Sequence, residues 1–177
     1  MEEKEFTLSV FTENKIGLMS RVVAIFTRRH INIDSLNASE SSMKGVFRFT
    51  IVVKVTEETV KKLIGQLDKQ IDIIKAFYYE RKDVVYQEIA LYKVPTHIFS
   101  NSQKVEQLIR SYNARILNIE PEYTVIEKTG LQSEIDDLLE ELKKIGIYEF
   151  VRSGRVAITK PMEQLTNYLK SLNLMEA

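Results

Sequence analysis

The sequence predicts an α+β fold made of two tandem ferredoxin-like domains, each with the element order βαββαβ. The first observation is that stretches of apolar alternation, typical of half-buried strands, are separated by stretches of helical apolar spacing. The second is that the same order of elements occurs in both halves of the 177 residues, with a period of about 80 residues. We infer the duplication from element order, because the two halves share little sequence identity.

Four strands and two helices are expected in the first half. Alternation predicts strands over residues 6–12, 31–38, 46–55 and 71–79. Helical spacing predicts one helix from Gly17 to His30 and another that begins after Thr56 and ends near Leu67. Thr56 is a favourable N-cap residue, and the acidic residues behind it suit a helix N-terminus. The second and third strands follow each other across a polar turn, so we expect a hairpin.

The second half repeats this order. Strands are predicted over residues 84–94, 114–119, 123–128 and 148–151, the last continuing through a turn into residues 156–158. Helices are predicted after Ser100 and after Thr129, where Ser/Thr-x-x-Gln resembles a capping box. A short terminal helix is predicted from Pro161 to Leu172, because proline is favourable at a first helical position.

The charged stretch from Glu80 to Asp83 is the expected joint between two domains, one over residues 1–80 and one over residues 83–177. In each domain two helices bury one face of the sheet, so the other face needs a cover. A partly apolar face of this kind favours contact with a partner subunit or domain. In the first domain we expect that face to contain Phe11, Ile33, Leu36 and Phe47.

The composition argues against several classes of function. Lysine plus arginine and aspartate plus glutamate each number 25, so the formal net charge is zero and no nucleic-acid partner or anionic membrane is expected. The chain has no cysteine and two histidines, which argues against disulfides and against a metal site. Since it shows no long apolar run and no signal-peptide pattern, we expect a cytoplasmic protein. Zero net charge also favours self-association.

The most informative segment is the Asn-x-x-Gly turn from Asn14 to Gly17, where the first strand passes directly into a helix. Such a turn leaves backbone N–H groups at the positive end of the helix dipole, which together make a small anion site. No plausible triad, metal set or pair of carboxylates can be assembled elsewhere, so we expect no catalytic residues. The interpretation is sensing of a small carboxylate.

These residues carry a family resemblance. The motif Glu13-Asn14-x-x-Gly17-x-x-Ser20-Arg21-Val22, then Phe26 and Asn32-Ile33-x-Ser35-Leu36, resembles the ACT domain of the small regulatory subunit of acetolactate synthase, also called acetohydroxyacid synthase. In the second half the order and spacing of that subunit are matched by Glu88-Ile89-Ala90-Leu91-Tyr92-Lys93-Val94, Arg115-Ile116, Thr129-Gly130 and Arg152-Ser153-Gly154. The resemblance thus covers nearly the whole chain.

The resemblance implies a function. Such subunits bind branched-chain amino acids, usually valine and also leucine or isoleucine, at an interface between ACT domains of a homodimer. They raise the activity of a separate large catalytic subunit and confer feedback inhibition on it. Thiamine diphosphate, FAD and magnesium belong to that catalytic subunit, so no cofactor is expected in this chain. The C-terminal domain is expected to contact the catalytic subunit.

The expected ligand site combines backbone donors, amide side chains and apolar side chains. Backbone N–H groups at the helix start would bind the ligand carboxylate, and glycine would let the backbone approach it. Two asparagine amides would supply acceptors for the ammonium, and apolar neighbours would enclose the aliphatic side chain. The expected ligand residues are Asn14, Ile16, Gly17, Leu18, Asn32 and Ile33.

Two alternatives remain open from the sequence. One is a free-standing ACT-type module that regulates a different enzyme or transcription, although such a module need not carry the pattern of the second half. The other is an enzyme on a ferredoxin-like scaffold, for which no catalytic set is visible. In the second domain Pro95-Thr96-His97 replaces the Asn-x-x-Gly turn, so we expect ligand at the first domain only.

Overall fold

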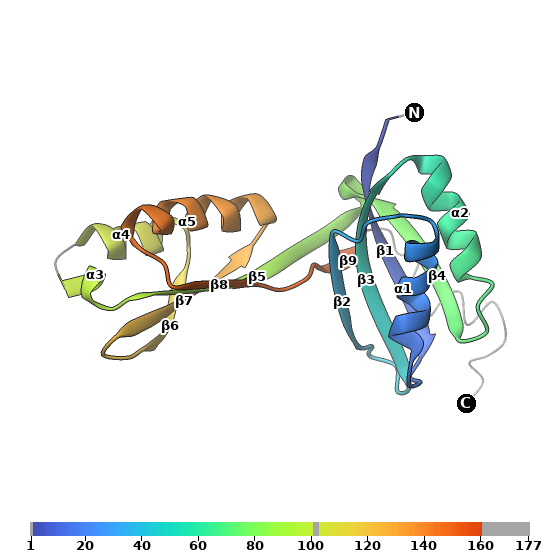
Figure 1. Ribbon diagram of the computed structural model, residues 1–177, viewed down its shortest axis with the longest axis horizontal. Coiled ribbons are helices and arrows are strands. Elements are labelled where there is room, and N and C mark those ends of the chain that lie inside the picture. Colours follow the sequence, from blue (N-terminus) through green and yellow to red (C-terminus); the bar gives the residue numbers. More distant parts are fainter. Residues whose placement is uncertain (1, 101–102, 161–177) are drawn as a thin grey trace. The chain divides into compact units, whose positions relative to one another are not determined.

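The computed structural model describes residues 2–100 and 103–160, which form two antiparallel sheets with their helices (Figure 1). In chain order the elements are β1 (Lys4–Glu13), α1 (Leu18–Arg28), β2 (Ser35–Glu40), β3 (Val46–Val55), α2 (Glu57–Leu67), β4 (Ile73–Glu80), the 3-10 helix η1 (Arg81–Asp83), β5 (Val84–Pro95), α3 (His97–Ser100), α4 (Gln103–Ser111), β6 (Arg115–Ile119), β7 (Tyr123–Gly130), α5 (Gln132–Ile145), β8 (Glu149–Arg152) and β9 (Val156–Thr159). The predicted α+β class with two βαββαβ halves is confirmed. The terminal helix predicted from Pro161 lies outside the described residues.

The chain divides into two compact units. Unit 2 contains residues 86–154, and unit 1 contains the residues before it together with residues 155–160, which we call the return segment. The second domain predicted over residues 83–177 includes the return segment, whereas the structure groups this segment with unit 1. It lies on unit 1 because Arg155 is buried there, with 2% of its surface exposed, and is hydrogen-bonded to β1. Unit 2 is therefore an insertion in the chain of unit 1.

The sheet of unit 1 has the strand order β2-β3-β1-β4, and all its neighbouring strands are antiparallel. In the centre, Leu8 of β1 pairs with Ile51 of β3 on one side and with Tyr78 of β4 on the other. The alternating side chains Phe6, Leu8 and Val10 are fully buried beneath the two helices, α1 and α2. Each such side chain contributes about 1.5–3 kcal/mol through burial. Core packing therefore fixes the position of β1, the strand that leads into the turn before α1.

The sheet of unit 2 repeats this topology, with the order β6-β7-β5-β8. Its core includes Tyr92 of β5, whose hydroxyl donates to the carbonyl of Ile135 in α5 at 2.8 Å. Burial raises the pKa of the Tyr92 phenol well above its ordinary value, because the charged form would lose its solvation. This buried hydrogen bond joins the central strand to a helix that covers it.

The helix start predicted at Thr56 is confirmed, and the one predicted at Thr129 is not. The backbone N–H of Thr59 donates to Thr56 Oγ1 at 3.3 Å, so Thr56 is the N-cap of α2 as predicted. The capping signature predicted at Thr129 is wrong, because that residue lies within β7. The cap of α5 is Leu131, whose N–H donates to the carboxylate of Glu134 at 2.8 Å. The glutamate thus satisfies one of the free N–H groups of the helix start.

The face of the unit 1 sheet opposite the helices, here called the open face, differs from expectation. Ile33, Leu36 and Phe47 pack against the helix-covered core, so their assignment to the open face was wrong. Phe11 does lie there, and the guanidinium of Arg48 is 5.5 Å from its ring centroid. The return segment of the same chain lies against this face through β9, which pairs with β5.

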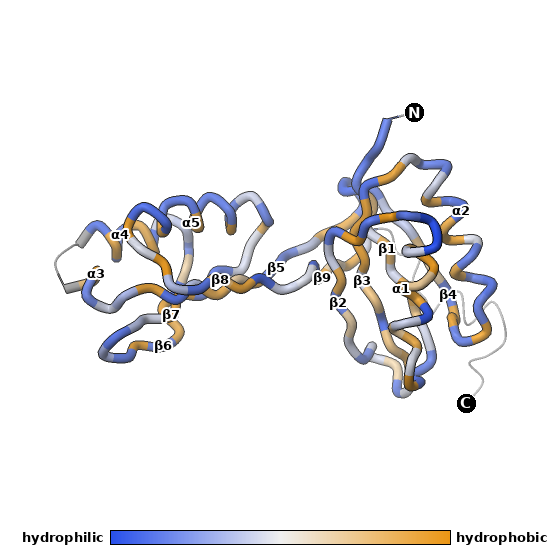
Figure 2. Tube along the Cα trace, in the orientation of Figure 1, coloured by the Kyte–Doolittle hydropathy of each residue, from blue (hydrophilic) through white to orange (hydrophobic). Residues whose placement is uncertain are grey.

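Hydropathy follows the layers. Figure 2 shows hydrophobic residues recurring along β3 and mostly hydrophilic residues along α5. This is the pattern of strands that bury one face and helices that present one face to solvent. Within the described residues, none of the helices combines the length and hydropathy needed to cross a membrane.

Candidate functional site

The turn between β1 and α1 has the backbone geometry of a helix-start anion site. Gly17 is the N-cap of α1 and lies in the left-handed region, with φ 79° and ψ 0°. A side chain there costs about 1–2 kcal/mol in backbone strain, although an added Cβ would meet no atom within 4 Å. The first helical hydrogen bond is donated by the N–H of Arg21 to the carbonyl of Gly17. The amides of Met19 and Ser20 therefore precede that bond and lie at the helix end.

The predicted ligand residues divide into exposed and buried side chains. Asn14 and Asn32 are exposed, and Ile16 is fully exposed. Leu18 is 4% exposed and packs in the core, against which Ile33 also packs in part. The N–H of Leu18 already donates to a backbone carbonyl, and Asn32 Nδ2 donates to the neighbouring Asp34 carboxylate at 3.0 Å. Ile16 and Leu18 thus do not enclose a common apolar space within this chain.

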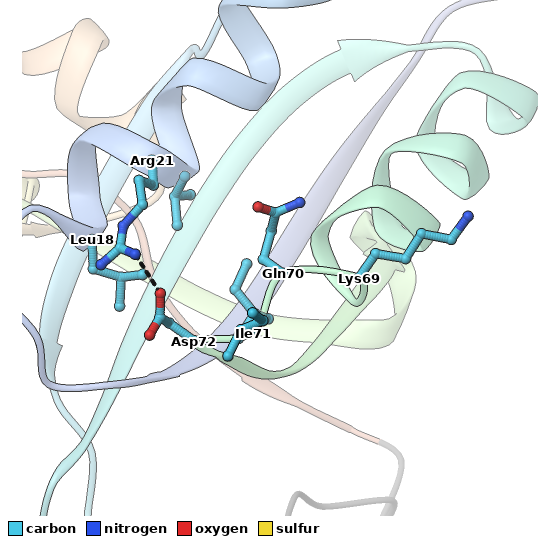
Figure 3. A pocket seen from close by; sticks show the side chains of 8 residues that line it. Leu18, Arg21, Lys69, Gln70, Ile71 and Asp72 are labelled. Atoms are coloured by element: carbon cyan, nitrogen blue, oxygen red, sulfur yellow. Dashed lines mark hydrogen bonds and ion pairs between the residues drawn. The ribbon is translucent and has the colours of Figure 1, made fainter.

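A pocket of about 240 Å³ lies beside the start of α1 (Figure 3). It is formed where α1 meets the segment between α2 and β4. Its lining residues are Leu18, Arg21, Val22, Lys69, Gln70, Ile71, Asp72 and Ile73. Of the predicted ligand residues that the structure describes, Leu18 alone belongs to this lining. The pocket lies just below the usual range for drug-sized ligands, which suits a small molecule.

Charged side chains converge at the mouth of this pocket. Arg21 Nη1 lies 2.5 Å from Asp72 Oδ2, an ion pair drawn in Figure 3, and Lys15 Nζ lies 3.1 Å from Asp72 Oδ1. Lys15 also pairs with Glu13 at 2.5 Å. The hydrogen bond to Glu13, followed by that to Asp72, raises the pKa of the Lys15 ammonium. Two cations and one shared carboxylate therefore lie beside the helix amides.

Sequence reasoning missed these three charged residues. Lys15 and Arg21 lie within the motif, so charge counting along the turn could have found them. Asp72 comes from the segment before β4, and only the fold brings it to the turn. Chemically, the amides and cations suit a carboxylate, and the Asp72 carboxylate could accept an ammonium. The described residues contain no cluster of three or more His, Cys, Asp or Glu able to hold a metal ion.

The corresponding turn in unit 2 has a different lining. A second pocket of about 570 Å³ lies where β5 ends, lined by Lys93, His97, Pro121, Glu122, Tyr123 and Tyr148. The Lys93 ammonium is 4.4 Å from the centroid of the Tyr123 ring. The turn carries Pro95-Thr96-His97 in place of a left-handed glycine before a long helix. It therefore does not reproduce the helix-start geometry found at Gly17.

Comparisons with known proteins cover both units. Residues 8–75 match the family described as "AHAS small subunit-like ACT domain", and residues 87–161 match the family described as "Small subunit of acetolactate synthase". The acetolactate synthase small subunit of Mycobacterium bovis is 35% identical over 160 residues, which cover 90% of this chain and 95% of that protein. That of Bacillus subtilis is 32% identical over 163 residues, covering 92% and 94%. The crystal structure of the small subunit from Thermotoga maritima has a TM-score of 0.82 and 28% identity, covering 90% and 99%.

Proposed function

Because the chain belongs to the family of acetolactate synthase small subunits, we propose that it is a non-catalytic regulatory subunit of acetolactate synthase. It binds a branched-chain amino acid, with valine as the first candidate, at an interface between the ACT domains of a homodimer. Without ligand it raises the activity of a large catalytic subunit, and with ligand it inhibits the assembled enzyme. The chemical reaction belongs to the large subunit.

The observation that carries this proposal is the extent of the similarity. Relatives named acetolactate synthase small subunit align with 90% or more of the chain, and a separate family match covers residues 87–161. A free-standing ACT module would account for unit 1 alone. The match of the second half therefore favours a partner of the acetolactate synthase type over regulation of an unrelated enzyme.

The site chemistry supports a zwitterionic ligand. The amides of Met19 and Ser20 at the start of α1 suit the ligand carboxylate, and Asp72 suits its ammonium. Arg21 gives the carboxylate a second donor once its pairing with Asp72 is relaxed. A site of this kind discriminates aliphatic side chains by only about 1–3 kcal/mol per methylene, so several branched-chain amino acids should give overlapping responses.

The exposed apolar residues support completion of the site by a second copy. Ile16 is fully exposed and Met19 is 49% exposed, both beside Gly17. Among the described residues of one chain, no apolar surface encloses a ligand side chain next to Ile16, whereas a second ACT domain could supply one. A neighbouring domain would also remove the site from water and strengthen its hydrogen bonds.

Titration and reconstitution test the proposal. Isothermal titration of the purified full chain with valine, leucine and isoleucine should show binding, while a non-branched control such as alanine binds more weakly. Capture of the purified large subunit, followed by activity measurement, should show activation that valine reverses. Absence of binding for all three branched-chain amino acids would refute the sensor role. Failure to bind or activate the large subunit would refute the partner assignment.

A further inference from the structure

Arg155 is anchored inside unit 1 although it directly follows the last residue of unit 2. Its side chain is 2% exposed, and its Nη1 donates to Glu5 Oε1 and to Thr7 Oγ1, both at 2.9 Å. Glu5 and Thr7 belong to β1, so the guanidinium lies on the central part of the sheet. A buried cation is strongly destabilising without its partners, and this pairing therefore fixes the chain at Arg155 in one position.

The backbone of Arg155 is also bonded to the segment that carries the candidate ligand residues. Its N–H donates to Ser35 Oγ at 2.8 Å. Ser35 is the first residue of β2 and directly follows the stretch from Asn32 to Asp34. β2 is an edge strand that pairs with β3 on one side, so fewer backbone hydrogen bonds oppose displacement of its start than oppose displacement of a central strand.

A second contact holds the return segment two residues further along. Arg48 Nη2 donates to the carbonyl of Ala157 at 2.7 Å and to Ser9 Oγ at 3.0 Å. Burial lowers the pKa of the Arg48 guanidinium, which is consistent with its position between sheet and return segment. The return segment is therefore attached to unit 1 through Arg155 and through Ala157, and the bond from Arg155 to Ser35 is the one next to the ligand stretch.

We propose that Arg155 is a positioning residue through which amino-acid binding at unit 1 is transmitted to the polypeptide leaving unit 2. Ligand contact at Asn32 and Ile33 displaces the start of β2, Ser35 Oγ moves with it, and the hydrogen bond carries that displacement to the backbone of Arg155. The side chain of Arg155, held by Glu5, gives this movement a fixed pivot. The inference rests on the proposed function, because it describes how the proposed site controls the assembled enzyme.

The test separates ligand binding from its effect on the enzyme. Ser35→Ala removes the side-chain acceptor, and Ser39→Ala changes an exposed serine of the same strand as a matched control. Valine affinity is measured by isothermal titration, and activation and valine inhibition are measured with the reconstituted enzyme. We expect Ser35→Ala to keep valine affinity and activation, while the valine concentration for half inhibition rises roughly fivefold. Ser39→Ala should match the wild type throughout.

Arg155 provides a second pair of variants. One nitrogen, Nη1, donates to both Glu5 and Thr7, so the ammonium of Arg155→Lys can reproduce these two bonds, whereas Arg155→Met cannot. Arg155→Met should lose inhibition and keep valine binding, and Arg155→Lys should restore inhibition in large part. If Arg155→Met does not fold, the Ser35→Ala result alone tests the transmission role of Arg155.

The outcomes distinguish this inference from the function on which it rests. A wild-type chain that binds no branched-chain amino acid refutes the proposed function and this inference with it. A wild-type chain that binds valine and is inhibited, together with Ser35→Ala and a folded Arg155→Met that are inhibited equally well, refutes the inference and leaves the function intact. Equal losses of valine affinity and inhibition would make Ser35 part of the ligand site and would also overturn the transmission role.

Discussion

Asp72 Oδ2 lies 2.5 Å from Arg21 Nη1 beside the unit 1 pocket, so a carboxylate of the protein already pairs with a cation in the first turn of α1. The same carboxylate binds Lys15 from its other oxygen. Any ligand carboxylate that uses these cations must compete with Asp72. The charges beside the pocket therefore neutralise one another, and the affinity for a ligand depends on how readily Asp72 exchanges its partners.

Asp72→Asn should weaken the binding of valine, because the neutral amide cannot form the proposed ion pair with the ligand ammonium. Since exposed ion pairs are worth up to about 1 kcal/mol, valine affinity should fall by up to about fivefold. Isothermal titration measures the change, and Asp137→Asn, an exposed residue of α5, controls for the change in net charge. Stronger binding by Asp72→Asn would mean that Asp72 competes with the ligand carboxylate for Arg21 and does not bind the ligand ammonium.

Gly17→Asp should abolish valine binding and feedback inhibition while the subunit still activates the enzyme. The new carboxylate would stand at the helix N-terminus, where it would satisfy the free amides and repel the ligand carboxylate. Gly17→Asn is the matched variant, because asparagine has the shape of aspartate, tolerates the left-handed conformation and is neutral. Valine affinity of Gly17→Asp should be at least about tenfold lower than that of Gly17→Asn. Equal affinities would place the ligand away from this turn.

Tyr92→Phe should lower the free energy of unfolding by about 1 kcal/mol, because the buried hydrogen bond from the Tyr92 hydroxyl to the carbonyl of Ile135 is lost. Chemical denaturation at neutral pH measures this cost. Tyr148→Phe, at a tyrosine that is 62% exposed, should change stability by less than about 0.5 kcal/mol. A null effect at Tyr92 would indicate that another donor replaces the phenol.

The same tyrosine should make the stability of unit 2 sensitive to alkaline pH. The pKa of Tyr92 is higher in the folded state than the ordinary value near 10, so its contribution is complete below about pH 10 and is lost as the pH rises through the folded-state pKa. Above pH 10 the wild type should lose more stability than Tyr92→Phe, measured by denaturation at several pH values. Parallel losses would assign the alkaline sensitivity to other groups.

Removal of the return segment should destabilise unit 1. A chain that ends at Gly154 lacks the carbonyl of Ala157 and the side chain of Arg155, so Arg48 loses a buried acceptor and Glu5 loses its cation. The expected cost is about 1–3 kcal/mol, measured by denaturation against a chain that ends at Lys160. Equal unfolding midpoints for the two chains would show that the segment is not required for the stability of the sheet.

Local patterns were sufficient to predict most of the fold. The alternation of Phe6, Leu8 and Val10, and the cap at Thr56, predicted elements that the structure confirms, because burial and capping act over a few residues. The prediction of which β2 side chains lie on the open face was wrong, because it also depended on a local pattern. The strand begins at Ser35 rather than at Ile31, so alternation could not be counted through Ile33, and a shift of register by one residue reverses the face.

The remaining features depend on contacts between distant parts of the chain. The turn at Gly17 was recognisable from sequence, whereas its neighbour Asp72 reaches it only through the loop before β4. The sequence predicts that Arg155 belongs to a turn of the second domain, and nothing in its local sequence indicates that it is buried beside β1. The ligand roles of Asn14 and Asn32 stay predictions.

The insertion of unit 2 into the chain of unit 1 has a consequence for synthesis. A ribosome completes β1 to β4 first, then all of residues 86–154, and only afterwards Arg155 and β9. At a synthesis rate of about 5–20 residues per second, the open face of unit 1 therefore stays uncovered for several seconds before the strand that lies against it has been made. During that interval Thr7 lacks its bond to Arg155 and Arg48 lacks its bond to the carbonyl of Ala157, so a nascent chain stalled before residue 155 carries an incomplete first domain.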